Sequence, residues 1–129
     1  MIVSVGADLI EVDRIQRVLD DSRIGRRFRD RDFTRNEIEY CEKKRRGRYE
    51  SYAGRFAAKE AVMKALGRGW GSKVRWLDIE VVRARSGKPE ITLHDQTAQF
   101  AEKLGIRRFS VSITHTEHYG MAYVIAEGD

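Results

Sequence analysis

A helix with an unusual placement of charge constrains the fold of this chain more than any other segment. The sequence predicts a helix over residues 51–66, because this stretch is rich in alanine and other strong helix formers, and Gly67 follows where helices commonly end. At roughly 100° per residue, Glu60 and Lys64 lie about 40° apart on this helix, between apolar neighbours. We therefore expect a buried helix that carries a carboxylate and an ammonium group on one strip.

Two interpretations of this ionic strip stay open from spacing alone. In the first, Glu60 and Lys64 form a favourable salt bridge between positions i and i+4, worth a few tenths of a kcal/mol. In the second, the two charges serve chemistry, since burying them is expensive unless a metal, a phosphate or a substrate uses them.

The rest of the sequence alternates between β-prone and helical patterns. Thr34 and Glu37 have the spacing of a capping box, and residues 86–89, Ser-Gly-Lys-Pro, are typical of a hairpin turn. Residues 21–33 are expected to be irregular. The N-terminal half is expected to contain a strand at 2–5, a helix capped by Asp13, and helices at 34–44 and 51–66. A hairpin of 77–84 with 90–93, a helix capped by Asp95 and ending at Gly105, and strands at 109–114 and 121–126 are expected to follow. This order predicts an α+β fold, a single domain over residues 1–129 with an antiparallel sheet packed against helices.

Composition narrows the location and the partners. The chain has 129 residues, of which 41% are apolar, enough for one modest core. Its one cysteine, Cys41, cannot form an internal disulfide, and the N-terminus lacks the pattern of a signal peptide, so we expect a cytoplasmic protein with no membrane partner. The net charge of +5, concentrated in residues 14–31 and 43–48, favours an anionic partner: nucleic acid, a phosphorylated cofactor or an acidic protein.

Five segments together resemble a known family. They keep the family's order along almost the whole chain: Gly6-Ala7-Asp8-Leu9-Ile10-Glu11, Arg55-Phe56-Ala57-Ala58-Lys59-Glu60-Ala61 through Lys64-Ala65-Leu66-Gly67, Asp78-Ile79-Glu80-Val81, Gly87-Lys88-Pro89 and Ser112-Ile113-Thr114-His115. In this combination the chain resembles the holo-(acyl carrier protein) synthases, the small phosphopantetheinyl transferases of fatty acid biosynthesis. The resemblance implies the phosphopantetheinyl transferase fold. It also implies transfer of phosphopantetheine from coenzyme A to a serine of an apo acyl carrier protein, with release of adenosine 3′,5′-bisphosphate.

The resemblance also assigns roles to the ionic strip. Asp8 and Glu60 match the family's magnesium ligands, and two carboxylates together with diphosphate oxygens and waters make an adequate magnesium site. Lys64 would stabilise phosphate oxygens as the serine oxygen attacks. A carboxylate near the metal has to accept the serine proton, directly or through a water, and Glu60 is favoured over Asp8 for this role.

Other positions match the family's contacts with coenzyme A and with the carrier. The cofactor-binding residues that the resemblance implies are Arg55, Lys64, Gly67, Lys88, Pro89, Thr114 and His115. Taken alone, a histidine at a strand end, such as His115, is structural at least as often as functional. Carrier proteins are acidic, so the expected docking residues are Arg14, Arg17 and Arg23. The family is typically trimeric with active sites at subunit boundaries, which makes a homotrimer the expected assembly.

Two other functions compete with the transferase. The basic runs also permit a small nucleic-acid-binding module, but the tryptophans and tyrosines are scattered rather than interleaved with the arginines, so no nucleic-acid partner is expected. A scaffold that binds carriers without catalysis is the third alternative, and the presence of Asp8, Glu60 and Lys64 argues against it.

Overall fold

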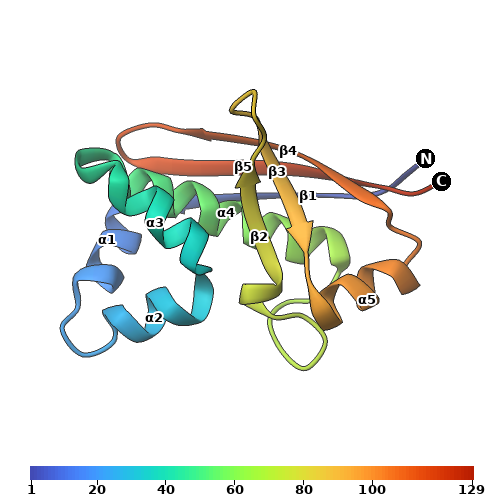
Figure 1. The fold of residues 1–129 in the computed structure, drawn as a ribbon, viewed down its shortest axis with the longest axis horizontal. Coiled ribbons are helices and arrows are strands. Elements are labelled where there is room, and N and C mark those ends of the chain that lie inside the picture. Colours follow the sequence, from blue (N-terminus) through green and yellow to red (C-terminus); the bar gives the residue numbers. More distant parts are fainter.

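Helix α4 (Arg48–Leu66) lies at the centre of the structure, a computed structural model that describes residues 1–129. Buried residues make up 12 of its 19 positions, so the helix is covered on nearly all sides rather than on one stripe. It begins three residues before the predicted start at Ser51 and ends as predicted, with Gly67 in the left-handed conformation at φ 74°. Figure 1 shows α4 along the large sheet, with three short helices towards one end and a two-stranded hairpin and a further helix towards the other. The three helices are α1 (Val12–Asp20), α2 (Gly25–Asp32) and α3 (Arg35–Lys43), the hairpin is formed by β2 (Ile79–Arg83) and β3 (Pro89–Leu93), and the further helix is α5 (Asp95–Lys103).

The large sheet consists of three antiparallel strands in the order β1, β5, β4, with bounds Ile2–Glu11, Tyr119–Glu127 and Arg108–His115. β1 has 10 residues, six more than the predicted strand at 2–5, and extends past Asp8. It crosses α4 so closely that a Cβ atom at Gly6 would lie 2.0 Å from the carbonyl oxygen of Ala61. This close approach brings Asp8, two residues further along β1, to the surface of α4.

The predicted hairpin is confirmed as a separate two-stranded sheet of β2 (Ile79–Arg83) and β3 (Pro89–Leu93). Gly87 adopts a φ of 89° in the turn, and Pro89 pairs with Arg83 at the first position of β3, where a missing N–H is tolerated. Helix α5 (Asp95–Lys103) follows, and its N-cap is His94 rather than the predicted Asp95.

Helices α1 (Val12–Asp20) and α3 (Arg35–Lys43) were both expected, with one error in their ends. The capping box that opens α3 is confirmed, since Thr34 Oγ1 accepts from the N–H of Glu37 at 3.2 Å and Glu37 Oε1 accepts from the N–H of Thr34 at 2.8 Å. The prediction that Asp13 caps α1 is wrong. β1 continues directly into α1, so that Glu11 occupies the cap position without a side-chain bond and Val12 N–H donates to His118 O.

The prediction that residues 21–33 are irregular is also wrong, because α2 (Gly25–Asp32) lies within them. Asp21 Oδ1 accepts from the N–H groups of Arg23 and Ile24 and turns the chain into this helix. A single aromatic, Phe28, then fixes α2 to the core through edge and tilted contacts with Phe33 and Phe56.

Most of these elements contribute to one cluster of 24 buried hydrophobic residues, and partly buried side chains of α2 and β3, among them Phe28 and Ile91, pack against it. The predicted α+β fold with antiparallel sheets is confirmed. The single-domain assignment stays a prediction. Cys41 belongs to the cluster as expected, and burial raises the pKa of its thiol to about 12. None of the helices combines the length and the apolar character needed to cross a bilayer.

Candidate active site

The ionic strip of α4 joins β1 rather than pairing within the helix. Lys64 Nζ donates to Asp8 Oδ1 at 3.0 Å and to the carbonyl oxygen of Ala7 at 3.1 Å. No ion pair joins Glu60 to Lys64 within 4.0 Å, so the first interpretation, a salt bridge within the helix, is wrong. The structure thus places Asp8, Glu60 and Lys64 around one point, where β1 crosses the helix.

The surroundings of Glu60 at this point disfavour its charged form. Partial burial raises its pKa, and the negative charge of Asp8 raises it further, while Lys64 and Arg14 act in the opposite direction without cancelling the effect. Two carboxylates that repel each other beside a mobile ammonium group favour a bound cation. The side chain of Lys64 is 55% exposed, so it is free to leave Asp8 for a ligand.

A third carboxylate lies behind this group, and the sequence did not reveal it. Asp32 is fully buried at the end of α2, and its charge also raises the pKa of Glu60. Arg31 binds both oxygens of Asp32 and at the same time stacks over the exposed ring of Trp70, 4.9 Å from its centroid. Burial raises the pKa of Asp32, with Arg31 opposing the shift. The segment after Gly67 is thereby attached to the acidic group through α2.

A pocket of about 350 Å³ lies where α3, α4, the hairpin and β4 meet. Arg55 and Arg83 direct their guanidinium groups over the ring of Tyr40, at 4.0 and 5.0 Å from its centroid, and Lys44 lies 4.9 Å from the same ring. Burial acts to raise the pKa of the Tyr40 phenol, but the hydrogen bond to Lys44 and the nearby cations together lower it.

Arg55 is the exceptional member of this basic pocket. It is only 6% exposed, it has no carboxylate within ion-pair distance, and its buried Nε has no hydrogen-bond partner. A buried guanidinium without a counter-charge is costly, and an anionic ligand would remove the cost. The pocket is therefore a candidate anion site.

The structure brings together only part of the predicted cofactor set. Pro89 and His115 line the basic pocket together with Arg55, and their role in cofactor binding stays a prediction. Gly67, at the end of α4, Lys88, exposed in the hairpin turn, and Thr114, on the outer face of β4, do not line it. The sequence analysis missed the other pocket residues, among them Tyr40, Lys44, Arg83 and one carboxylate, Glu50. Only Lys44 gave a signal, as a member of the basic run at 43–48.

The three predicted docking arginines have different surroundings. Arg14 is exposed on α1 and lies near enough to Glu60 to lower the pKa of that carboxyl. Arg17 lines a cleft with acidic side chains of α1, and Arg23 pairs with Asp21 at 3.7 Å. Arg14 is thus the member of the set that faces the acidic group.

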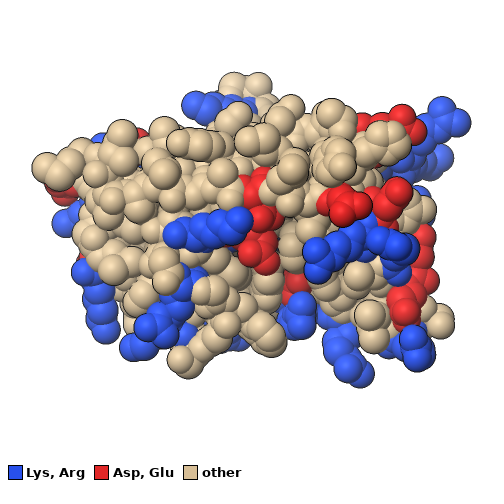
Figure 2. All heavy atoms as spheres, turned by 180° about the vertical axis from the view of Figure 1, so that it is seen from behind, with Lys and Arg blue, Asp and Glu red and all other residues tan.

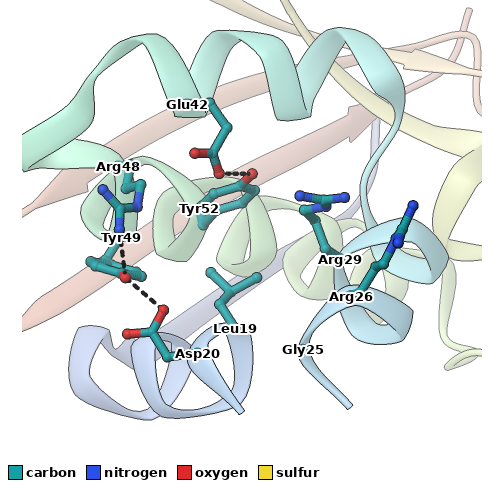
Figure 3. A pocket seen from close by; sticks show the side chains of 9 residues that line it. All are labelled: Leu19, Asp20, Gly25, Arg26, Arg29, Glu42, Arg48, Tyr49 and Tyr52. Atoms are coloured by element: carbon teal, nitrogen blue, oxygen red, sulfur yellow. Dashed lines mark hydrogen bonds between the residues drawn. The ribbon is translucent and has the colours of Figure 1, made fainter. Parts of the chain in front are cut away.

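A further cleft, of about 440 Å³, separates α1 and α2 from the first turns of α4 (Figure 3). Tyr49 donates to Asp20 at 2.6 Å and Tyr52 donates to Glu42 at 2.7 Å, so the tyrosines of α4 satisfy the carboxylates of α1 and α3. The bond between Tyr49 and Asp20 holds α1, and with it Arg14, against α4. We therefore regard this cleft as part of the scaffold.

Comparison with known proteins identifies the family. Residues 4–124 match the family model described as the 4′-phosphopantetheinyl transferase superfamily. The chain is 54% identical to a holo-[acyl-carrier-protein] synthase of Solibacter usitatus, over 98% of this chain and 99% of that protein. The crystal structure of the Neisseria meningitidis holo-[acyl-carrier-protein] synthase matches with a TM-score of 0.86 at 32% identity, covering 98% of this chain and 99% of that one.

A second crystal structure, of the Helicobacter pylori holo-[acyl-carrier-protein] synthase in complex with coenzyme A, matches with a TM-score of 0.82 at 31% identity, over 95% of this chain and 99% of that one. The chain belongs to the holo-[acyl-carrier-protein] synthases of the 4′-phosphopantetheinyl transferase superfamily. The resemblance seen in its five sequence segments is confirmed, and so is the enzyme class.

Proposed function

We propose that this enzyme transfers phosphopantetheine from coenzyme A to a serine of an acidic apo acyl carrier protein, with magnesium, and releases adenosine 3′,5′-bisphosphate. The observation that carries the proposal is the placement of two complementary half-sites on α4. The basic pocket around Arg55 suits the phosphorylated adenosine of the donor. The acidic group of Asp8 and Glu60, about five residues or roughly 8 Å further along the helix axis, suits the reacting diphosphate.

The buried charge of Arg55, which has no carboxylate partner, is the strongest support for the first half-site. Its Nε is buried without a partner, and Arg83, Lys44 and His115 lie around the same pocket. Phosphate oxygens would satisfy these donors with charge-assisted hydrogen bonds. The coenzyme A bound to the Helicobacter pylori relative agrees with a donor of this kind.

The donor set of the second half-site fits magnesium. Asp8 and Glu60 supply two carboxylates from adjacent elements, and diphosphate oxygens and waters complete the shell that this ion prefers. The repulsion that raises the pKa of Glu60 is what a cation would relieve. When bound, magnesium would offset the charge on the diphosphate of the donor.

The residues of this chain then perform the transfer. The serine oxygen of the carrier forms a bond to the β-phosphorus, the bond from that phosphorus to the bridging oxygen breaks, and adenosine 3′,5′-bisphosphate leaves with the electron pair. Lys64 turns from Asp8 to the phosphate oxygens, where its charge stabilises the charge that develops on them. Glu60, which lies beside the reacting diphosphate, takes the serine proton directly or through a water that it orients, with Asp8 as the alternative base.

We also propose that Arg14 begins the docking surface for the carrier, with Arg17 and Arg23 as outer contacts. Arg14 lies beside the acidic group, so a carrier helix that meets it would present its serine to Glu60. Long-range attraction between the basic helices and an acidic partner should accelerate encounter and weaken with salt. The cytoplasm, where carrier and coenzyme A meet, is the proposed location.

The outer face of the large sheet supports the proposed trimer. β1 exposes Val5 and Leu9, and β5 exposes Met121 and Tyr123, with Leu9 directly opposite Met121 in the register. In the view from behind, the upper part of the surface carries few charged side chains, whereas acidic and basic side chains cross its middle and lower half (Figure 2). A contiguous apolar face of this kind marks an interface. Thr114 lies on this face, so its proposed role in cofactor binding would be played across a subunit boundary.

The test is to incubate the enzyme with coenzyme A, magnesium and an apo acyl carrier protein and to measure the mass of the carrier. We expect a gain equal to one phosphopantetheine group in the wild type. Glu60→Ala should abolish the gain while carrier binding, measured by calorimetry, persists. An unchanged carrier mass with the wild-type enzyme would rule out the transferase. Tight, salt-sensitive binding of a DNA or RNA oligonucleotide would then favour the nucleic-acid-binding module.

A further inference from the structure

A buried lysine next to the acidic group has no part in the chemistry proposed above. Lys59 precedes Glu60 on α4 and is fully buried. Its ammonium group donates to the carbonyl oxygens of Trp76 at 3.1 Å and Ile79 at 2.6 Å, and it pairs with Glu37 Oε1 at 2.7 Å. All three hydrogens of the ammonium group therefore have acceptors within the protein.

Glu37 extends this contact to two further elements. Its Oε2 accepts from the backbone N–H of Val81 at 2.8 Å, and its Oε1 accepts from the N–H of Thr34 in the capping box. The Lys59–Glu37 pair thus joins the middle of α4 to the start of α3 and to strand β2. We refer to Lys59, Glu37 and their backbone partners as the buried clamp.

The buried clamp contacts the β2–β3 hairpin, which is not part of the large sheet. β2 and β3 pair only with each other, and no ladder of backbone hydrogen bonds connects them to β1, β5 or β4. The bonds of the buried clamp to the carbonyl oxygen of Ile79 and to the N–H of Val81 lie in the first three residues of β2. Arg83, two residues or about 7 Å beyond Val81, and Pro89 opposite it carry the hairpin's side of the basic pocket.

A contribution to folding stability does not by itself explain the presence of the buried Lys59–Glu37 pair. Burial lowers the pKa of Lys59, against the attraction of Glu37, which shows that desolvation opposes the charge. Buried ion pairs can often be replaced by apolar side chains without loss of stability, whereas they do define one geometry among competing ones. The geometry that this pair defines is the position of the hairpin relative to α4.

We propose that Lys59 is a positioning residue for the donor: through Glu37 it fixes the β2–β3 hairpin against α4, so that Arg83 and Pro89 face Arg55 across the basic pocket. The inference rests on the proposed function, since the ligand of that pocket is taken to be the phosphorylated adenosine of coenzyme A. The acidic group needs only β1 and α4. Loss of the clamp therefore weakens donor binding and leaves the chemical step intact.

The test uses the double variant Lys59→Met with Glu37→Gln, which removes both charges and leaves neither unpaired. We expect the KM for coenzyme A to rise about tenfold, a common size for coupling between linked sites, with kcat and the KM for the carrier unchanged within about twofold. The Kd for adenosine 3′,5′-bisphosphate, measured by calorimetry, should rise by the same factor. Tyr52→Phe is the matched control, because it removes one hydrogen bond of a fully buried α4 side chain away from the hairpin and should change neither KM nor Kd.

The outcomes separate the two proposals. A wild-type enzyme that neither transfers phosphopantetheine nor binds the bisphosphate overturns the proposed function. A normal wild type and a folded double variant with unchanged KM and Kd overturn the positioning role alone, as does a fall in kcat at unchanged KM. If the double variant does not fold, hydrogen exchange in the wild type decides. Saturating bisphosphate should slow exchange of the Val81 amide more than that of Val5, which pairs in the large sheet, and a uniform effect overturns the proposal.

Discussion

The contact between β1 and α4 gives the sharpest test of how the acidic group is built. Gly6→Ala places a Cβ atom 2.0 Å from Ala61 O and 3.0 Å from the nitrogen of Ala65. Both neighbours are backbone atoms of a buried helix, so no side chain can turn away. Cβ atoms do not approach oxygen more closely than 3.0 Å, and therefore the strand and the helix have to separate by at least 1 Å, the difference between 3.0 and 2.0 Å.

That separation acts on stability and on the site together. Overpacking of a core of this kind destabilises by about 3 kcal/mol. The bonds from Lys64 Nζ to Asp8 at 3.0 Å and to Ala7 O at 3.1 Å join the two elements, and the flexible lysine can follow a shift of 1 Å. Asp8 moves with β1, however, so its carboxylate is displaced by the same amount relative to Glu60 on α4. We expect Gly6→Ala to lower the free energy of unfolding by about 3 kcal/mol and to reduce kcat/KM for transfer in the fraction that stays folded.

The measurement is urea denaturation, with Gly69→Ala as the control for stability. A Cβ at Gly69 meets nothing within 4 Å, so this variant should unfold within about 0.5 kcal/mol of the wild type. If Gly6→Ala also stays within that range, the close packing of β1 on α4 does not exist as described. In that case the placement of Asp8 beside Lys64 is unsupported.

Three further predictions concern charge. The pKa of Glu60 is higher in the folded than in the unfolded state. Its protonation therefore stabilises the fold at pH values below the ordinary carboxyl pKa of about 4, and this contribution is lost as pH rises through the folded-state pKa. Metal-free Glu60→Gln should therefore be more stable than the wild type in urea at pH 8, with an advantage that vanishes on acidification; an advantage that grows in acid contradicts this. Arg14→Glu should weaken carrier binding in calorimetry at low salt and flatten its salt dependence, and unchanged affinity excludes the docking surface. Chelation of magnesium should stop transfer yet leave the affinity for adenosine 3′,5′-bisphosphate within about twofold, because Arg55 lies outside the acidic group. Loss of both transfer and bisphosphate binding would contradict the division into two separate half-sites.

The parts of the molecule that local rules govern could be predicted from the sequence. The capping box of Thr34 and Glu37, the left-handed Gly67 and the turn before Pro89 all depend on neighbours within a few residues, and the structure has each of them. The α4 helix was recognisable because alanine and apolar residues fill it. The family motifs placed Asp8, Glu60 and Lys64 together before their geometry was known.

The missed features depend on partners that are distant in the sequence. α2 has arginines on most of its faces and one aromatic anchor, so no apolar period reveals it, and Asp32 was hidden with it. The sequence around Lys59 predicts a buried helix but does not indicate what the lysine binds. Its partners lie 17 to 22 residues away in either direction, at Trp76, Ile79 and Glu37. Tyr40 and Arg83 come together only when α3 and the hairpin fold against α4.

The charged side chains of α4 point to different sides of the helix, and this arrangement restricts how an anionic donor can bind. Arg55 and Glu60 lie about 140° apart around the axis, so the helix presents a cation to one side and a carboxylate to another. An anionic donor is attracted to the first side and repelled from the second, where Asp8 and Asp32 add to the negative charge. The diphosphate can therefore approach the acidic group only when a cation and Lys64 compensate it. In the proposed mechanism, a donor bound at Arg55 alone would stay unreacted until that compensation is complete, which would make the reaction depend on magnesium and, through Arg14, on the arrival of the carrier.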